Sequence, residues 1–184
     1  MQTDNELYAR FLAGDNTAYD ELMTRYGDSI VVYINAYLHH WQDAEDLMIE
    51  AFARIMFQRP VIRQGGFRAY LYKTARNLAA RFHASAGRTK HINLDDLSEE
   101  TADAAALEER VIGTERKRIL HRCLERIDEK YREVLWLIYF EEMSYAEAAA
   151  VMRVTVKRID KLLKKGKEKL RIELEKEGIT SAYE

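Results

Sequence analysis

Apolar residues recur along this chain at the spacing of amphipathic helices, and no segment shows the alternation that is typical of strands. The pattern predicts an almost entirely α-helical protein with a single proline, Pro60. Residues 58–66 hold that proline and two adjacent glycines, so we expect a loop there. The expected helices cover Asp4–Ala13, Asn16–Tyr37, Asp43–Gln58, Phe67–Ser85, Ala104–Ile127, Lys130–Glu141 and a final pair that begins at Ser144 and Thr155.

The final pair of helices is separated by a turn of at most four residues. Ser144 and Glu147 have the spacing of a capping box, in which each side chain satisfies a free backbone donor at a helix start. Thr155 is a suitable cap for the second helix, which we expect to run to about Leu174. In the first helix Ala148, Val151 and Met152 form the stripe expected to face inward.

The second helix of this pair is rich in cations on one side. Between Arg153 and Arg171 nine Lys or Arg stand against Asp160 and Glu168, a local net charge of +7. Such a helix fits the major groove of DNA, although a solvated basic face on an ordinary bundle helix has the same charge. The capping box and the short turn favour DNA binding. The stripe expected to be buried consists of Val156, Ile159, Leu162, Leu163, Leu170 and Leu174.

Charge along the chain comes in blocks, which the overall net charge of −2 conceals. Residues 1–52 carry two cations against ten acids, whereas residues 53–90 carry nine cations and no acid. Residues 91–110 carry seven acids against one cation, and residues 111–184 carry seventeen cations against fourteen acids. Blocks of this size indicate separate surfaces for separate partners, some of them polyanionic.

The acid-rich block divides the chain into two helical modules. Residues 1–88 form the first predicted domain and residues 107–184 the second, with a flexible acidic linker at 89–106. Within the first module, the helix from Asp43 to Phe52 exposes an acidic cluster near its start. The helix from Phe67 to Phe82 exposes cations beside Phe67, Tyr70 and Tyr72, a mixture that suits single-stranded DNA, although tyrosines are equally often core or boundary residues.

Three motifs in order give the chain a family resemblance. DAEDL followed by EAF, then F-x-x-Y-L-x-x-x-A-R-N-L, then Y-R-E-V-L with S-Y-x-E-x-A resemble bacterial RNA polymerase sigma factors of the extracytoplasmic-function (ECF) type, in the sigma-70 superfamily. The resemblance covers both modules. It implies an all-α protein, with a sigma2-like helical bundle and a sigma4-like helix-turn-helix domain, that initiates transcription without catalytic chemistry of its own.

The resemblance also implies partners and sites. Sigma factors of this type bind core RNA polymerase through the clamp helices of its largest subunit and through its flap, and they recognise the minus-10 and minus-35 promoter elements. An anti-sigma factor is a further possible partner. The residues that match core binding are Asp43, Glu45, Asp46, Ile49 and Glu50. Those that match minus-10 recognition are Arg63, Phe67, Arg68, Tyr70, Lys73, Arg76, Asn77 and Arg81, and those that match minus-35 recognition are Lys157, Arg158, Asp160, Lys161, Lys164 and Lys165.

Two positions of the helix-turn-helix depart from an ideal DNA reader. Asp160 can accept from a cytosine amino group, or it can pair with Lys157, Lys161 or Lys164 along the helix. Arg153 stands in the turn where the family usually has glycine, so we expect an altered turn or mild strain there.

Other functions fit the sequence less well. A stand-alone helix-turn-helix regulator leaves the acidic and the aromatic-cationic helices of the first module unexplained. A metal enzyme using Asp43, Asp46 and Glu50 lacks a second carboxylate helix with Glu-x-x-His, so no metal or cofactor is expected. The single cysteine, Cys123, is expected in the core, and the absence of a signal or spanning segment predicts a cytoplasmic protein.

Overall fold

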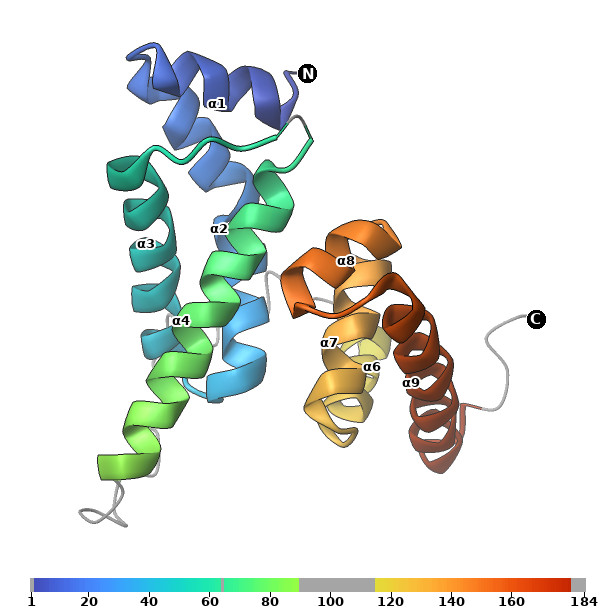
Figure 1. The fold of residues 1–184 in the computed structure, drawn as a ribbon. Helices are drawn as coiled ribbons and strands as arrows, with labels where there is room; N and C mark the ends of the chain where they lie inside the picture. The colour runs from blue at the N-terminus through green and yellow to red at the C-terminus, as the bar shows by residue number, and fades with distance from the viewer. Residues whose placement is uncertain (1, 64, 90–114, 180–184) are drawn as a thin grey trace. The chain divides into compact units, whose positions relative to one another are not determined.

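The computed structural model describes residues 2–63, 65–89 and 115–179, and within these ranges the regular elements are all helical. Contacts divide the chain into two compact units, Met1–Leu107 and Glu108–Glu184, here called unit 1 and unit 2 (Figure 1). The predicted linker at 89–106 and the expected helix start near Ala104 lie outside the described residues, apart from Thr89. The expectation of an all-α protein is confirmed.

Unit 1 is a bundle of four helices, α1 (Asp4–Leu12), α2 (Asn16–Leu38), α3 (Trp41–Gln58) and α4 (Phe67–Thr89). Helices α2, α3 and α4 pack side by side, and α1 crosses one end of α2 and also contacts α4 (Figure 1). Asp15 caps α2 by accepting from the backbone N–H of Thr17, and His40 caps α3. The predicted loop follows α3, which ends at Arg59 in the left-handed region with φ +42°.

Unit 2 is built around the long helix α9 (Val156–Lys176), which packs against α6 (Glu115–Glu125), α7 (Glu129–Leu135) and α8 (Tyr145–Met152). Cys123 is buried as expected, and burial raises the pKa of its thiol. Gly166 allows a close approach of α9 to α7, because a Cβ atom there would lie 3.3 Å from Leu135 and 3.4 Å from the carbonyl oxygen of Tyr131.

The helix expected over Lys130–Glu141 differs in one respect from the prediction. After α7 the chain widens into a π-helical turn, η1 (Trp136–Phe140), in which the N–H of Glu141 donates to the carbonyl of Trp136. The wider turn brings the rings of Trp136 and Phe140 face to face, with centroids 4.5 Å apart. The Trp136 indole N–H also donates to a carboxylate oxygen of Glu141 at 3.1 Å, which stabilises the turn.

Candidate functional site

The predicted helix-turn-helix of unit 2 is confirmed in its caps and its turn. The Ser144 hydroxyl accepts from the backbone N–H of Glu147 at 3.2 Å, and the Glu147 carboxylate accepts from the N–H of Ser144 at 2.8 Å. Helix α8 ends at Arg153, whose N–H donates to the carbonyl of Ala149. Thr155 then caps α9 by accepting from the N–H of Arg158 at 3.2 Å. Both helices therefore have fixed ends, and the turn between them is short.

Arg153 adopts the left-handed conformation, with φ +55° and ψ +44°. This region favours glycine because a Cβ atom crowds the following carbonyl oxygen. The strain expected from a non-glycine residue in this turn is therefore present in the structure.

The two faces of α9 separate sharply. Ile159, Leu162 and Leu163 are buried in unit 2. Val156 is 49% exposed, contrary to the expectation, because it is the first residue of the helix and the buried stripe begins one turn later. Leu170 and Leu174 are only partly buried. The predicted DNA contacts Lys157, Arg158, Lys161, Lys164 and Lys165 are all exposed, and Asp160 is partly exposed.

Two further lysines of α9 lie over aromatic rings of unit 2. The Nζ atom of Lys167 lies 5.1 Å from the centre of the Tyr139 ring, and that of Lys169 lies 5.6 Å from the Tyr131 ring. Lys169 is also 4.0 Å from a carboxylate oxygen of Asp128. The set chosen from the sequence for DNA contact thus excludes the two lysines that lie over aromatic rings.

The acidic side of α3 in unit 1 carries the predicted core-binding residues. Asp46 is exposed and Ile49 is 54% exposed, whereas Asp43, Glu45 and Glu50 are partly exposed. Glu50 pairs with Arg54, with an Nη2–Oε1 distance of 2.6 Å. Sequence reasoning missed Phe57, which is 80% exposed and lies at helical spacing from Asp46 and Ile49. The face is therefore acidic with an apolar stripe along it.

The residues predicted to recognise the minus-10 element lie in the loop between α3 and α4 and along α4. Arg63 and Arg81 are exposed, and Arg68, Tyr70, Lys73, Arg76 and Asn77 are partly exposed. The expectation that Phe67 and Tyr72 are exposed beside these cations is wrong, since their exposures are 1% and 0%. Phe67 instead packs against the rings of Tyr8 and Tyr26, and Tyr72 against Tyr33.

Burial of Phe67 and Tyr72 shows that α4 buries more of its surface than expected. Helix α4 contacts α1, α2 and α3, so a broad arc of its surface is covered rather than a single stripe. Of the three aromatic residues expected beside the cations, Tyr70 is partly exposed. Stacking of a base on Phe67 would require the bundle to open locally.

The residues described in both units contain no group of three or more His, Cys, Asp or Glu side chains that could hold a metal ion. Among the helices that the structure describes, none combines the length and the apolar character needed to cross a membrane.

Comparison with known families gives two matches, in the order that the motifs predict. The family model for Sigma-70 region 2 matches residues 22–89, which include α3, the loop and α4. The family model for Sigma-70, region 4 matches residues 117–170, which include α8, the turn and most of α9. Together they match about two thirds of the chain.

Curated relatives match across nearly the whole length. The RNA polymerase sigma-H factor of Pseudomonas aeruginosa is 28% identical over 167 residues, covering 85% of this chain and 86% of the relative. The ECF RNA polymerase sigma factor SigW of Bacillus subtilis is 25% identical over 170 residues, covering 88% and 91%.

The fold also resembles a solved structure. The sigma factor RpoE of Bartonella quintana, in complex with the anti-sigma factor NepR, superposes with a TM-score of 0.67 at 16% identity, covering 85% of this chain and 96% of that one. With matches in both units, this chain belongs to the sigma-70 family as an RNA polymerase sigma factor of the ECF type, a transcription initiation factor, not an enzyme, that directs RNA polymerase to promoters.

Proposed function

We propose that the chain recognises a promoter at two points, using α9 for the minus-35 element and the loop with α4 for the minus-10 element. The observation that carries the proposal is the one-sided helix α9, whose exposed cations stand at the start of a capped helix after a short turn. Recognition helices of this class place their first turns in the major groove. The rest of the positive charge then neutralises phosphates.

Within α9 the proposed roles follow from position. Lys157 and Arg158 lie in the first turn and contact phosphates at the groove edge. Asp160, Lys161, Lys164 and Lys165 lie on the reading face, where lysine can donate to guanine O6 and N7. The ion pair between Asp160 and Lys164 favours a role for Asp160 in orienting that lysine.

In unit 1 the exposed and partly exposed cations of the loop and α4 hold the non-template strand of the opened minus-10 element. Arg63 lies in the loop, and Arg68, Lys73, Arg76 and Arg81 follow along α4, with Asn77 among them. Tyr70 supplies the ring on which an unpaired base can stack. Phe67 lies beneath this surface, where it is buried against the rings of Tyr8 and Tyr26.

The acidic face of α3 is the proposed contact with the polymerase clamp. Asp46 supplies exposed negative charge, while Ile49 and Phe57 supply exposed apolar surface on the same side. A contact that combines apolar anchors with a charged rim is typical of specific interfaces. Unit 2 would bind the polymerase flap.

Because RNA polymerase acts in the cytoplasm, a cytoplasmic location stays a prediction for this chain. An anti-sigma factor also stays a prediction. It is motivated by the RpoE structure, which was solved with NepR.

Run-off transcription with purified core polymerase tests the proposal. The chain and the core enzyme are incubated with fragmented genomic DNA, and the transcript starts are sequenced. We expect transcripts that share two upstream sequence elements at a fixed spacing. A stand-alone regulator would give no promoter-specific transcript under these conditions.

Base substitutions in each element of one promoter then assign the two units. Variants of α9 should change how strongly transcription responds to substitutions in the upstream element. Variants of α4 should change its response to substitutions in the downstream element. Equal response of both sets of variants to both elements would contradict the two-point assignment.

A further inference from the structure

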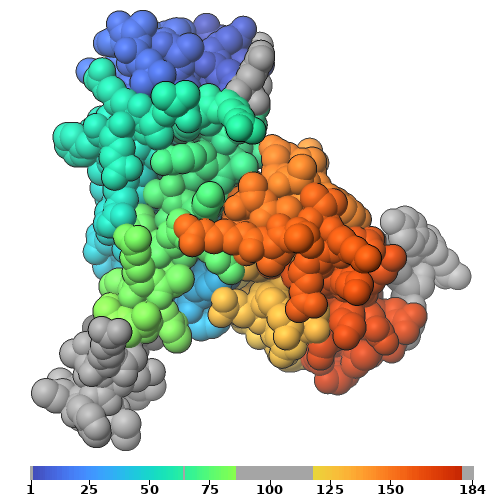
Figure 2. Space-filling model, in the orientation of Figure 1, coloured from blue at the N-terminus to red at the C-terminus, as the bar shows by residue number. Residues whose placement is uncertain are grey.

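The loop between α3 and α4 is tied to the N-terminal helix by a hydrogen bond. The hydroxyl of Tyr8 on α1 donates to the carbonyl of Pro60 at 2.9 Å. Next to it the Arg59 guanidinium lies 5.3 Å from the centre of the Phe11 ring. Figure 2 shows the segment around residue 60 on the surface of unit 1, next to α1. The first residues of the loop are therefore held from α1.

Two side chains further along the loop lie in solvent, whereas that of Ile62 is partly buried. Val61 is fully exposed and Arg63 is exposed. The N–H of Gly66 donates to the carbonyl of Arg63 at 2.8 Å, which closes the end of the loop on itself. The contacts of Tyr8 and Phe11 are thus the means by which α1 restrains the start of the loop.

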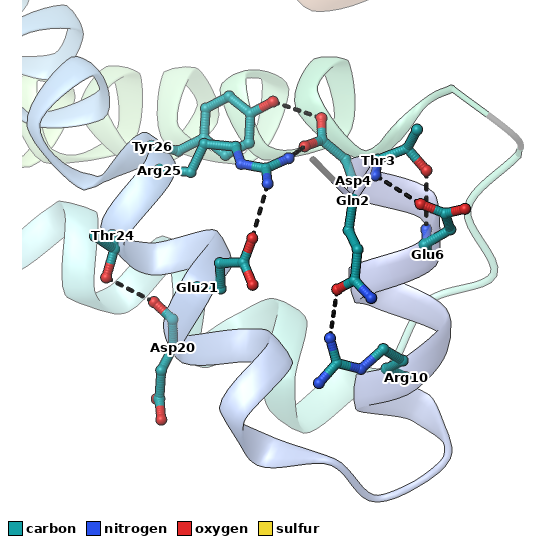
Figure 3. Close-up of polar contacts among 10 residues, drawn as sticks. All are labelled: Gln2, Thr3, Asp4, Glu6, Arg10, Asp20, Glu21, Thr24, Arg25 and Tyr26. Carbon is teal, nitrogen blue, oxygen red and sulfur yellow. Dashed lines mark hydrogen bonds and ion pairs between the residues drawn. The ribbon is translucent and has the colours of Figure 1, made fainter.

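Helix α1 is itself fixed to α2 by polar contacts (Figure 3). A carboxylate oxygen of Asp4 accepts from Nη1 of Arg25 at 2.7 Å, and the other accepts from the hydroxyl of Tyr26. The side chains of Arg25 and Asp4 are 18% and 23% exposed, so this pair is better shielded from solvent than a surface pair. Burial, and then the hydrogen bond to Asp4, raise the pKa of Tyr26, which keeps its hydroxyl protonated as a donor.

The rings of Tyr8 and Tyr26 also contact the first residue of α4. The Phe67 ring lies 5.3 Å from the ring of Tyr8 and 6.3 Å from that of Tyr26. Burial raises the pKa of Tyr8, Tyr70 adds to the rise and Arg59 opposes it, so Tyr8 also stays a donor at neutral pH. Tyr8 therefore contacts the loop through its hydroxyl and the first residue of α4 through its ring.

We propose that Tyr8 is a positioning residue for minus-10 recognition, holding residues 59–63 of the loop in the conformation that receives the opened strand. The inference rests on the proposed function of the loop. Ordering the loop in advance favours binding, because an ordered loop loses less conformational entropy when a base enters it. Loss of the Tyr8 hydroxyl should therefore weaken strand binding without removing any group that touches DNA.

The test compares two tyrosine hydroxyls in the same bundle. Y8F removes the hydrogen bond to the loop, whereas Y19F removes a buried hydrogen bond from Tyr19 to the carbonyl of Phe52 on α3. Holoenzymes made with each variant are titrated with a single-stranded oligonucleotide that carries the minus-10 sequence of a promoter found by transcript sequencing. Core binding and the unfolding temperature of each free chain are measured alongside.

We expect Y8F to weaken strand binding about 3- to 10-fold, which corresponds to one hydrogen bond of about 0.5–1.5 kcal/mol. Y19F should leave strand binding within about twofold, although both variants lose one hydrogen bond of this size. Equal effects of Y8F and Y19F would overturn the proposal, because they would show a general loss of stability.

R63A separates the failure of this inference from the failure of the proposed function. If R63A weakens strand binding and Y8F does not, the loop binds DNA but Tyr8 does not position it. If neither variant changes strand binding, the assignment of the loop to the minus-10 element falls together with the role of Tyr8.

Discussion

The Nζ atom of Lys164 lies 3.0 Å from Oδ2 of Asp160, one turn earlier on α9. The Lys164 side chain is 76% exposed and that of Asp160 is 42% exposed, so the pair contributes little to stability. Its influence is on binding, because it places one negative charge among the cations that approach DNA. The pair matches one of the two roles that the sequence allowed for Asp160, which is pairing with a lysine along the helix.

Substitution of Asp160 by asparagine should therefore strengthen binding of the holoenzyme to duplex DNA of any sequence. Lys164 becomes available to a phosphate, so the slope of log affinity against log salt concentration should steepen by about one unit. Fluorescence anisotropy with a promoter duplex and a scrambled duplex at several salt concentrations measures both effects. Loss of preference at a single base pair, with no change in salt dependence, would instead assign Asp160 to base recognition.

Lys161 is predicted to contact a base in the minus-35 element. Replacement by alanine should lower the affinity for the promoter by about 1–3 kcal/mol and relax the preference at one base pair. Lys176 offers a matched control, because it is an exposed lysine at the far end of α9 that pairs with Glu173. If K161A and K176A weaken binding equally and at every sequence, Lys161 contributes only general charge.

Asp46 tests the acidic face of α3. D46A should weaken binding to core polymerase by about 1 kcal/mol, roughly fivefold, mainly through slower association. D20A serves as the control, since Asp20 is also exposed but lies on α2. Surface plasmon resonance with immobilised core enzyme measures both rates, and an unchanged association rate for D46A would count against this face.

The helix-turn-helix could be predicted from sequence because its determinants are local. Ser144 with Glu147, and Thr155, form caps with residues three positions away, so the helix starts depend little on the rest of the fold. The charged face of α9 followed equally from spacing, because one side of that helix meets α6, α7 and α8.

The exposure of α4 could not be predicted in the same way. Helical spacing identifies the centre of a buried face but not its width, which depends on how many helices cover it. Three helices contact α4, and they bury Phe67 and Tyr72, which were expected to be exposed. The exposure of Phe57 could have been found from spacing, because Phe57 follows Asp46 by about three helical turns and so lies on the exposed side of α3.

Acid should destabilise unit 1 partly through Asp15. Hydrogen bonds from the Thr17 side chain, followed by those from Arg10, hold the pKa of Asp15 below its ordinary value of 3.8. The stability that this carboxylate contributes is fully present above its unfolded-state value and is lost as the pH falls through the lower folded-state value. D15N keeps an acceptor for the helix cap, so its free energy of unfolding should fall less steeply with acid below about pH 4. Urea denaturation across this range, with both chains compared at each pH, would contradict the assignment if the two profiles were parallel.

Arg153 allows the strain in the DNA-binding turn to be measured. Its φ of +55° costs an arginine about 1–2 kcal/mol, while glycine loses about 0.5–1 kcal/mol more backbone entropy on folding. R153G should therefore stabilise unit 2 by roughly 0.5–1 kcal/mol, visible as a higher unfolding temperature. R158G is the contrasting variant, because residue 158 lies in the first turn of α9 and should lose stability on the same change. If R153G also weakens promoter binding while raising stability, the Arg153 side chain contacts DNA and the strained turn has been kept for that contact.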